Sequence, residues 1–315
     1  MITRRGLLKL AGVGFASLAA AVAYPFSEVF ARPRITHYRL TPNGWPEGLK
    51  LRACVVADIH ACEPWMNRRR IEGICNQVQD LKPDIILLLG DYLSGMTLAS
   101  DPLGPSEWAP VLGGLSAPLG VHAVLGNHDY WEDPAFQQDP TTVPVVLRAL
   151  DGAGIAVHVN RAVRIEKDGR HFWLAGLGDQ MALLPDARQG RSRMRGIDDL
   201  QATLADVQDD APVVLLAHEP DIFHAVDDRV ALTLSGHTHG GQINLFGWRP
   251  FSASPGSARY PAGVYREGSR HLVVSRGSDA RPFRCASATV RNWFFWSWGT
   301  SARPSGFAIG SRRTR

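Results

Sequence analysis

The sequence predicts a layered α/β protein built around one large domain, because short apolar runs alternate with longer amphipathic segments along the chain. Five apolar runs have the length and composition of buried strands. They are Leu51 to Ala57, Ile85 to Leu89, Val121 to Leu125, Val213 to Leu216 and Val230 to Leu234. The roughly 280 residues that follow the N-terminal segment suffice for one domain with an ample core.

Amphipathic segments between these runs predict helices, because their apolar residues recur with helical spacing. The predicted helices are Asn67 to Leu81, Thr142 to Ala153 and Ile197 to Val207. In the last, Asp198 and Asp199 are expected in the first turn, where they complement the helix dipole. After His239 the pattern becomes β-rich, with a strand expected near His271 to Ser275.

Three other segments are less regular and rich in Gly, Pro and aromatic or arginine residues. They are Tyr92 to Pro118, Gln180 to Gly196 and Phe246 to Gly263. This composition is typical of loops, so we expect them to surround the mouth of an active site.

A short polar cluster follows each of the five apolar runs. The clusters are Asp58-Ile59-His60, Gly90-Asp91, Gly126-Asn127-His128-Asp129, Ala217-His218-Glu219 and Gly236-His237-Thr238-His239. Loops after the carboxyl ends of strands meet at one edge of a sheet in layered α/β folds. We therefore expect the five clusters to form one site, complete by His239.

The residue types in these clusters indicate a metal site. Carboxylate, imidazole and amide ligands together suit Mn, Fe or Zn, whereas Mg or Ca would take mostly oxygen ligands. A single Gly-Asp is usually a turn, and His218 alone would be an ordinary loop histidine. Seven potential ligands at five strand ends are different, because desolvating them without a metal or charge partner costs free energy. Paired metals about 3.5 to 4 Å apart recur in phosphate ester cleavage.

The ordered set Asp-x-His, Gly-Asp, Gly-Asn-His-Asp, His and Gly-His-x-His resembles the calcineurin-like metallophosphoesterase superfamily. The strings Gly-Asn-His-Asp and Gly-His-Thr-His-Gly-Gly-Gln are similar to those of its exported bacterial YkuE/YaeI-like branch. The resemblance spans Asp58 to His239 in the family's order. It implies an α/β fold of two packed mixed β-sheets flanked by helices.

The resemblance also implies a role for each clustered residue, with two divalent metal ions (Mn, Fe or Zn) as cofactors. Asp58, His60 and His239 would bind one metal ion, Asn127, His218 and His237 would bind the other, and Asp91 would bridge both. A metal-bound hydroxide would attack phosphorus, because a cation lowers the pKa of bound water.

His128 is then the candidate catalytic acid, because imidazole titrates near neutral pH. Asp129 could orient it. In serine/threonine phosphatases the second cluster continues with another aspartate and an arginine, but here it reads Tyr92-Leu93-Ser94-Gly95. The partner of His128 is therefore open, and phosphoprotein substrates are disfavoured. Ser275-Arg276-Gly277 resembles a run near the carboxyl end of the exported branch, and Arg276 could contact a substrate phosphate.

The expected function is hydrolysis of a phosphodiester or phosphomonoester. The alternatives are a pyrophosphatase acting on a lipid-linked or nucleotide-sugar substrate, and a non-catalytic envelope-binding protein that retains metals. All seven ligands and His128 are present, which argues against the last alternative.

Residues 1–31 have the features of a twin-arginine signal segment, which would make the export machinery a partner. Arg4 and Arg5 precede a mildly apolar stretch from Leu10 to Phe26 that is rich in Ala and Gly. The expected location is the periplasm or the outer face of the cytoplasmic membrane. The small residues before Arg32 suggest cleavage, although the stretch is nearly long enough for an uncleaved anchor. The alternative is an ordinary amphipathic or core helix.

Charge gives little support for a nucleic-acid partner. The net charge is +4, and the first 31 residues contain three of the basic and one of the acidic residues, which leaves +2 for residues 32–315. Four arginines among Ser, Gly and Pro predict a disordered basic tail at 301–315, so the phosphoesterase domain is expected at 32–300.

The aromatic run from Trp293 to Trp298 is open to two interpretations. It could contact a membrane interface, or form a final strand whose aromatic side chains pack on a sheet, which we favour. Disulfide pairing is also open. The four cysteines are Cys54, Cys62, Cys75 and Cys285, and none is expected to be a metal ligand.

Overall fold

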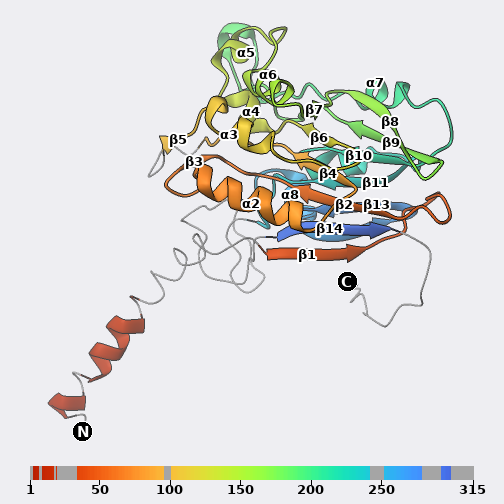
Figure 1. Ribbon diagram of the computed structural model, residues 1–315. Coiled ribbons are helices and arrows are strands. Elements are labelled where there is room, and N and C mark those ends of the chain that lie inside the picture. Colours follow the sequence, from red (N-terminus) through yellow and green to blue (C-terminus); the bar gives the residue numbers. More distant parts are fainter. Residues whose placement is uncertain are drawn as a thin grey trace.

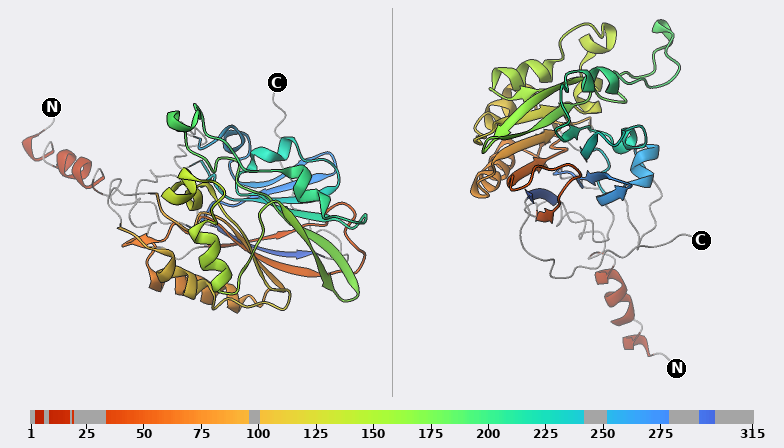
Figure 2. Two further views of the ribbon diagram at one scale, coloured as in Figure 1. Left: turned by 90° about the horizontal axis from the view of Figure 1, so that it is seen from above. Right: turned by 90° about the vertical axis from the view of Figure 1, so that its right-hand side faces the viewer.

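Two six-stranded sheets pack face to face in the computed structural model, with helices on their outer faces (Figures 1 and 2). The structure describes residues 3–6, 9–17, 19, 34–95, 101–241 and 252–278, and the backbone of 292–298. The α/β class and the two mixed sheets expected from the sequence are confirmed.

The first sheet contains three of the predicted strands side by side at its centre. In spatial order it comprises β1 (Arg34–Arg39), β14 (Asn292–Trp298), β2 (Leu51–Val56), β4 (Ile85–Leu89), β6 (Val121–Val124) and β7 (Ala156–Val157). Strands β2, β4, β6 and β7 are parallel, while β14 is antiparallel to β2. The favoured strand at Trp293 to Trp298 is therefore present in the backbone, and its side chains lie outside the described residues.

The second sheet contains the other two predicted strands, again at its centre. In spatial order it comprises β12 (Gly263–Glu267), β13 (Arg270–Val274), β11 (Val230–Ser235), β10 (Val213–Leu216), β9 (Arg170–Gly176) and β8 (Arg161–Lys167). Its four inner strands are parallel and its two edge strands are antiparallel. A two-stranded ribbon joins β3 (Cys62–Glu63) to β5 (Asp101–Pro102).

The helices lie outside the two sheets. They are α2 (Arg68–Asp80), α3 (Pro105–Leu112), α4 (Asn127–Trp131), α5 (Pro134–Gln138), α6 (Val145–Gly152), α7 (Leu200–Ala205) and α8 (Pro255–Arg259), with short 3₁₀ turns η1 (Ala187–Gln189) and η2 (Pro220–His224). Helices α2, α6 and α7 confirm the three predicted ones. Asp199 is the N-cap of α7, and its side chain accepts the Ala202 N–H. It therefore precedes the first turn instead of lying within it.

The segment Tyr92 to Pro118, whose composition is typical of a loop, contains the helix α3. Glu107 at the start of α3 accepts the Gly104 N–H at 2.8 Å, and Trp108 and Leu112 are buried. The prolines and glycines around α3 made the segment look like a loop. One of these prolines occupies the first turn of the helix, where proline is favoured.

Alternation along the strands builds two layers of core. Val55 and Leu87 of the first sheet meet Leu216 and Leu234 of the second in the core between the sheets. Cys54 and Leu88, which point the other way, pack beneath α2, α3 and α6. Because both faces of β2, β4, β10 and β11 are covered, these strands read as continuous apolar runs.

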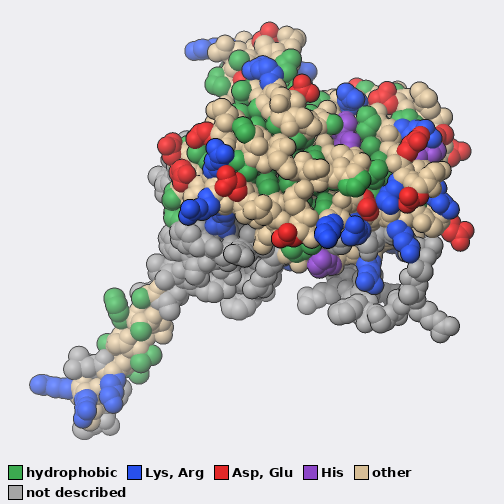
Figure 3. Space-filling model, in the orientation of Figure 1, with side chains coloured by type: hydrophobic (Ala, Val, Ile, Leu, Met, Phe, Trp, Pro, Cys, Tyr) green, Lys and Arg blue, Asp and Glu red, His purple; other side chains and the backbone are tan. Residues whose placement is uncertain are grey.

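Residues 4–6 and 9–17 are helical, and apolar side chains are exposed along this segment (Figure 3), namely those of Leu10, Val13 and Phe15. Among the described residues, no helix has both the length and the apolar character needed to cross a membrane. Cys54 and Cys75 are buried free thiols, while Cys285 and the basic tail at 301–315 lie outside the described residues. The assignment of residues 1–31 as a signal stays a prediction.

Candidate metal centre

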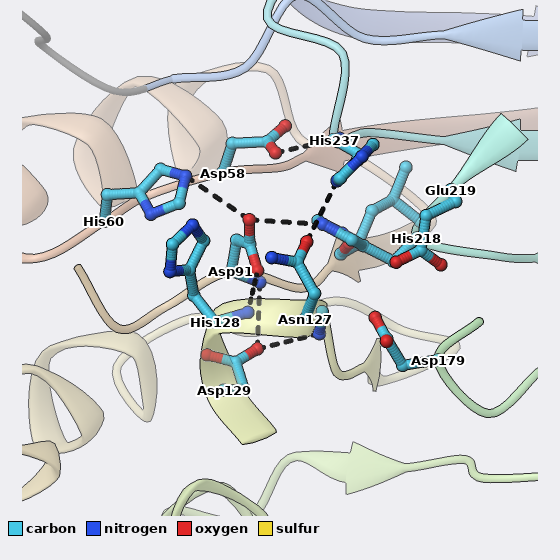
Figure 4. Close-up of polar contacts among 12 residues, drawn as sticks. Asp58, His60, Asp91, Asn127, His128, Asp129, Asp179, His218, Glu219 and His237 are labelled. Atoms are coloured by element: carbon cyan, nitrogen blue, oxygen red, sulfur yellow. Dashed lines mark hydrogen bonds and ion pairs between the residues drawn. The ribbon is translucent and has the colours of Figure 1, made fainter. Parts of the chain in front are cut away.

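The five polar clusters meet at one edge of the two sheets, beyond the carboxyl ends of β2, β4, β6, β10 and β11 (Figure 4). Their His and Asp side chains form two groups with the spacing of metal ligands. One group is Asp58, His60, Asp91 and His239, and the other is Asp91, His218 and His237. The carboxylate of Asp91 is common to both.

Short distances connect the members of each group. The Asp91 Oδ2 atom lies 3.4 Å from His60 Nε2 and 3.2 Å from His218 Nε2. In the first group, His239 Nε2 lies 3.3 Å from His60 Nε2 and 3.7 Å from Asp58 Oδ1. Asp91 is therefore placed between imidazoles of both groups, as a bridging ligand requires.

Asn127 adds an amide oxygen to the second group. Its Oδ1 atom lies 2.9 Å from His237 Nδ1. All seven expected ligands are thus gathered in one place, while Cys62 belongs to neither group.

Hydrogen bonds to backbone carbonyls orient two of the imidazoles. The Nδ1 atoms of His60 and His218 lie 2.9 Å from Leu93 O and 2.6 Å from Leu89 O. A carbonyl accepts only from an N–H group, so each Nδ1 carries a proton and each Nε2 is the nitrogen that a metal ion would take, releasing any proton bound there. This is the arrangement of a metal-binding histidine whose second nitrogen is fixed by the protein.

A buried ring nitrogen supports metal binding. The Nε2 atom of His237 makes no hydrogen bond with any residue that the structure describes, although the side chain is buried. A buried polar atom without a partner costs free energy, which coordination to a cation would recover. The mixture of imidazole, carboxylate and amide donors suits a divalent transition metal better than Mg or Ca. The residues present therefore fit a pair of divalent cations.

The electrostatics of the site keep Asp91 ionised. Burial alone would raise the pKa of Asp91, but the imidazoles of His218, His128 and His60 hold it well below its usual range. Burial lowers the pKa of His218, but the Asp91 carboxylate outweighs this and raises it well above the usual range. Burial, together with His218, lowers the pKa of His237 well below the usual value. This cluster, without cations, holds positive charge beside Asp91.

Five of the expected ligands adopt the left-handed backbone conformation. The φ angles are 56° for Asp58, 47° for His60, 58° for Asp91, 63° for His237 and 49° for His239. Non-glycine residues rarely adopt this conformation, and such strain concentrates at functional sites. At the strand ends, this backbone conformation turns the side chains of these residues toward one another.

Asp129 organises the backbone of the site, which corrects the expectation that it orients His128. Its Oδ1 atom accepts the N–H groups of Tyr92 and Leu93, and its Oδ2 atom accepts those of Asp91 and Gly126, at distances between 2.8 and 3.0 Å. Burial and the nearby Asp91 raise the pKa of Asp129 to about 7. Its carboxylate thus ties the loop after β4 to the loop after β6.

Glu132 is the carboxylate that faces His128, and the sequence analysis missed it. The His128 Nδ1 atom lies 3.4 Å from Glu132 Oε1, while the His128 backbone N–H donates to Asp91 Oδ1 at 2.9 Å. A Cβ at Gly95 would come within 2.4 Å of His128 Nδ1 and 2.6 Å of Glu132 Oε1, so only glycine fits there. The signal in the sequence is the i,i+4 spacing of the pair.

The ring of His128 is held between two other aromatic side chains. Its centroid lies 5.1 Å from that of His60 and 5.1 Å from that of Trp131, in edge-to-face arrangements. The Trp131 Nε1 atom donates to Met181 O at 2.7 Å. The segment that begins near Gln180 therefore forms part of the wall beside His128, as expected for a loop around the site.

Gly277 also lies against the site, although every ligand found among the described residues lies at or before His239. A Cβ on Gly277 would lie 3.0 Å from both Asp58 Cβ and His239 Nδ1. Its neighbour Arg276 lies near Tyr38. Burial raises the pKa of Tyr38, and the positive charge of Arg276 offsets part of that rise. A contact between Arg276 and a substrate phosphate stays a prediction.

A second buried pair of acids lies behind His218 (Figure 4). Asp179 and Glu219 are fully buried, and burial together with their mutual repulsion raises the pKa of Asp179 well above its usual range. Glu219 Oε2 accepts the Gln180 N–H at 3.1 Å. The raised pKa favours the protonated form of Asp179, so this pair carries less negative charge than two free carboxylates would.

Comparison with known proteins gives matches over the whole site. The model of the family described as "Calcineurin-like phosphoesterase" matches residues 51–241. The chain is 29% identical over 240 residues to the "Uncharacterized metallophosphoesterase YkuE" of Bacillus subtilis, covering 76% of this chain and 74% of that protein. It is 34% identical over 199 residues to "Phosphodiesterase YaeI" of Escherichia coli, covering 61% and 63%. A dimetal phosphatase from Danio rerio aligns with a TM-score of 0.41 at 12% identity, covering 74% of this chain and 89% of that one.

Proposed function

The chain belongs to the calcineurin-like phosphoesterases, and on that premise we propose that it hydrolyses phosphodiesters or phosphomonoesters with two divalent metal ions. The resemblance noted from the sequence is thereby confirmed at the level of the family. One observation carries the proposal. Two groups of metal-ligating side chains share the Asp91 carboxylate. The imidazole of His128 lies beside them and belongs to neither group.

The ligands would divide between the two cations as their grouping indicates. Asp58, His60 and His239 would hold one, Asn127, His218 and His237 would hold the other, and Asp91 would bridge them. When bound, two divalent cations would draw electron density from a phosphoryl group and lower the pKa of a water molecule toward neutrality.

His128 would donate a proton to the leaving oxygen as the bond between that oxygen and phosphorus breaks. Its backbone is fixed by Asp91 and its ring by His60 and Trp131, so the imidazole keeps one orientation beside the ligands. Glu132 faces the Nδ1 atom and would stabilise the protonated ring. Asp129 would hold the loops that carry Asp91 and Asn127 in register.

The experiment is an activity profile of the purified chain, stripped of metal and reloaded with Mn, Fe or Zn. The substrates are a phosphomonoester and a phosphodiester with the same chromophoric leaving group, and a pyrophosphate ester. Cleavage of the pyrophosphate ester breaks the P–O–P bond, so it is followed by the phosphate products. We expect metal-dependent turnover that is greatest on a monoester or a diester. Asp91→Asn, prepared identically, measures any contaminating phosphatase.

Two outcomes would contradict the proposal. Greatest turnover on the pyrophosphate ester would favour the alternative of a lipid-linked or nucleotide-sugar pyrophosphatase. Metal binding at both groups without turnover on any ester would favour the non-catalytic alternative.

We propose further that the protein acts in the periplasm or at the outer face of the cytoplasmic membrane, after twin-arginine export. Support comes from Arg4 and Arg5 ahead of the Ala- and Gly-rich stretch, and from the exposed apolar residues of that helical segment. Changing Arg4 and Arg5 together to Lys should leave an active enzyme in the cytoplasm. Unchanged appearance of this variant beyond the cytoplasmic membrane on fractionation would remove the twin-arginine assignment.

A further inference from the structure

A narrow arm projects from the domain (Figure 2). This basic arm comprises residues 183–195. Its two sides pair through backbone hydrogen bonds, between Leu183 and Arg195 and between Asp186 and Arg191, at distances from 2.8 to 3.0 Å. The turn η1 forms its tip, and Gly190 closes the turn with φ 69°. The arm is therefore a folded hairpin-like element.

The basic arm is anchored to the end of α5, mainly by Gln137 and also by the Gln138 carbonyl, which accepts from the Gln189 side chain at 3.1 Å. Gln137 Oε1 accepts the Leu184 N–H at 3.0 Å, and Gln137 O accepts from the side chains of Gln189 and Arg191 at 3.2 Å. Arg191 also donates to Leu184 O at 3.1 Å, so its guanidinium is committed to the arm. These contacts fix the direction in which the arm projects.

Three other arginines of the arm have exposed guanidinium groups. Arg188, Arg193 and Arg195 make no side-chain hydrogen bond or ion pair with any residue that the structure describes. The arm's one acid is Asp186, and its carboxylate accepts the Arg188 backbone N–H at 2.8 Å. Three positive charges are thus presented without compensation on a small element.

Met194 lies between two of these arginines and is 46% exposed. It contributes to none of the described core clusters. A flexible apolar side chain flanked by guanidinium groups has the chemistry of an interfacial contact, in which the charges meet phosphates and the apolar group enters the acyl boundary.

The arm begins at the wall of the metal centre. Met181, two residues before it, accepts the Trp131 indole N–H, and the Trp131 ring contacts His128. The neighbouring Gln180 side chain donates to Glu219 O at 2.9 Å, beside the expected ligand His218. A surface bound by the arm would therefore be held on the side of the molecule where Trp131 flanks His128.

We propose that the basic arm docks the protein on a bilayer containing anionic phospholipids, with Arg188, Arg193 and Arg195 on the lipid phosphates and Met194 in the acyl boundary. Charge complementarity favours this occupant. The arm contains no aromatic residue on which bases could stack, and the small net charge of residues 32–315 disfavours nucleic acid. Three exposed arginines spread along the arm suit a surface that carries many phosphates better than one free phosphate ion.

The test is sedimentation of the full-length protein with vesicles of phosphatidylcholine, with and without phosphatidylglycerol. Each basic residue near an anionic surface contributes about fivefold to partitioning, so Arg188, Arg193 and Arg195 changed together to Ser should weaken binding on the order of a hundredfold. The loss should appear only with phosphatidylglycerol. Residues 1–31 are the same in every variant, so their contribution cancels.

Arg69, Arg161 and Arg170 changed together to Ser form the matched control, because all three are exposed and lie on α2, β8 and β9. This triple should bind within a fewfold of the unchanged protein. Arg193→Glu alone, which reverses one charge, should weaken binding by tens of fold and avoids a triple substitution. Met194→Ser should weaken binding to the vesicles severalfold.

Equal losses in the arm triple and the control triple would overturn the proposal, because binding would then follow overall charge. So would unchanged binding of the arm triple and of Arg193→Glu. Hydrolysis of a soluble ester is measured in parallel and should be unchanged in the arm variants. Absence of hydrolysis in every variant would contradict the proposed function and leave the docking result intact.

Discussion

The two sheets contribute different chemistry to the metal centre. Loops after strands of the first sheet supply both carboxylates, the amide and one imidazole, namely Asp91, Asp58, Asn127 and His60. Loops after strands of the second supply His218, His237 and His239, which are all imidazoles. Each of the two ligand groups takes members from both sheets. The anionic part of the site therefore belongs to one sheet, and neither sheet can hold a cation pair alone.

The two halves are also held in place differently. In the first sheet, the Asp129 carboxylate fixes the loops through four backbone N–H groups. In the second, the ligands are tied to the first sheet, because the His237 N–H donates to Asp58 Oδ1 at 2.9 Å and His218 is fixed by Leu89 O. The first sheet thus acts as the frame against which the imidazoles of the second are positioned.

The largest effect should follow from removing the shared carboxylate. Asp91→Asn should lose most of both metal ions and lower turnover well beyond a hundredfold, which is the upper range for changes outside the ligand shell. His237→Asn, in only one ligand group, should lose about one ion. Elemental analysis of both variants decides the point. Two equivalents of metal and near-normal turnover in Asp91→Asn would contradict the bridging role.

His128→Ala should be the next largest effect, and it separates catalysis from metal binding. Turnover should fall roughly 10²- to 10⁴-fold on esters with alkoxide-like leaving groups, the usual range for general acid catalysis. The loss should be much smaller with p-nitrophenolate, which leaves without a proton. The two losses are compared at matched metal content. Equal losses on both esters would mean that His128 positions the phosphate, and loss of a metal would mean that it is a ligand.

Asp129→Asn should test the frame of the first sheet. Each oxygen of the Asp129 carboxylate accepts two backbone N–H groups. In asparagine, one of these oxygens is replaced by an NH₂ group, which cannot accept, so two of the four hydrogen bonds are lost. We expect the free energy of unfolding to fall by about 1.5 to 3 kcal/mol, measured by denaturant unfolding. Asp151→Asn, at an exposed position, is the control. Unchanged stability of Asp129→Asn would show that these bonds do not hold the loops.

Glu132→Ala should have the smallest effect, about tenfold on turnover, because Glu132 acts only through His128. The loss should fall on kcat rather than KM and should disappear in the His128→Ala background, which a double-mutant cycle measures. Glu72→Ala, at another exposed glutamate, is the control. Additive losses from Glu132→Ala and His128→Ala would remove the proposed pairing.

The sequence revealed the central strands and the ligands because both depend on local patterns. Strands covered on both faces read as apolar runs, and each polar cluster follows such a run. Strand β8 was missed because its charged, exposed residues interrupt any apolar run. Strand β9 contains the buried apolar run Phe172 to Ala175, which the sequence analysis overlooked. The role of Asp129 was wrong because it depends on where four backbone N–H groups point, which the order of residues does not specify.

Other parts of the site were missed because only the fold brings them together. Gly277 follows His239 by more than thirty residues of chain and returns to contact Asp58. Asp179 and Glu219 meet behind His218 through the packing of β9 beside β10. No spacing rule in one sequence connects such residues.

The central claim is that two cations shared between the sheets make one catalytic site, and metal stoichiometry against turnover tests it most directly. The stripped protein is titrated with one divalent metal while bound metal and ester hydrolysis are measured on the same samples. We predict saturation at two ions per chain, with little turnover until the second ion binds, because both ligand groups must be filled around Asp91. Full turnover at one ion per chain or fewer would contradict the account.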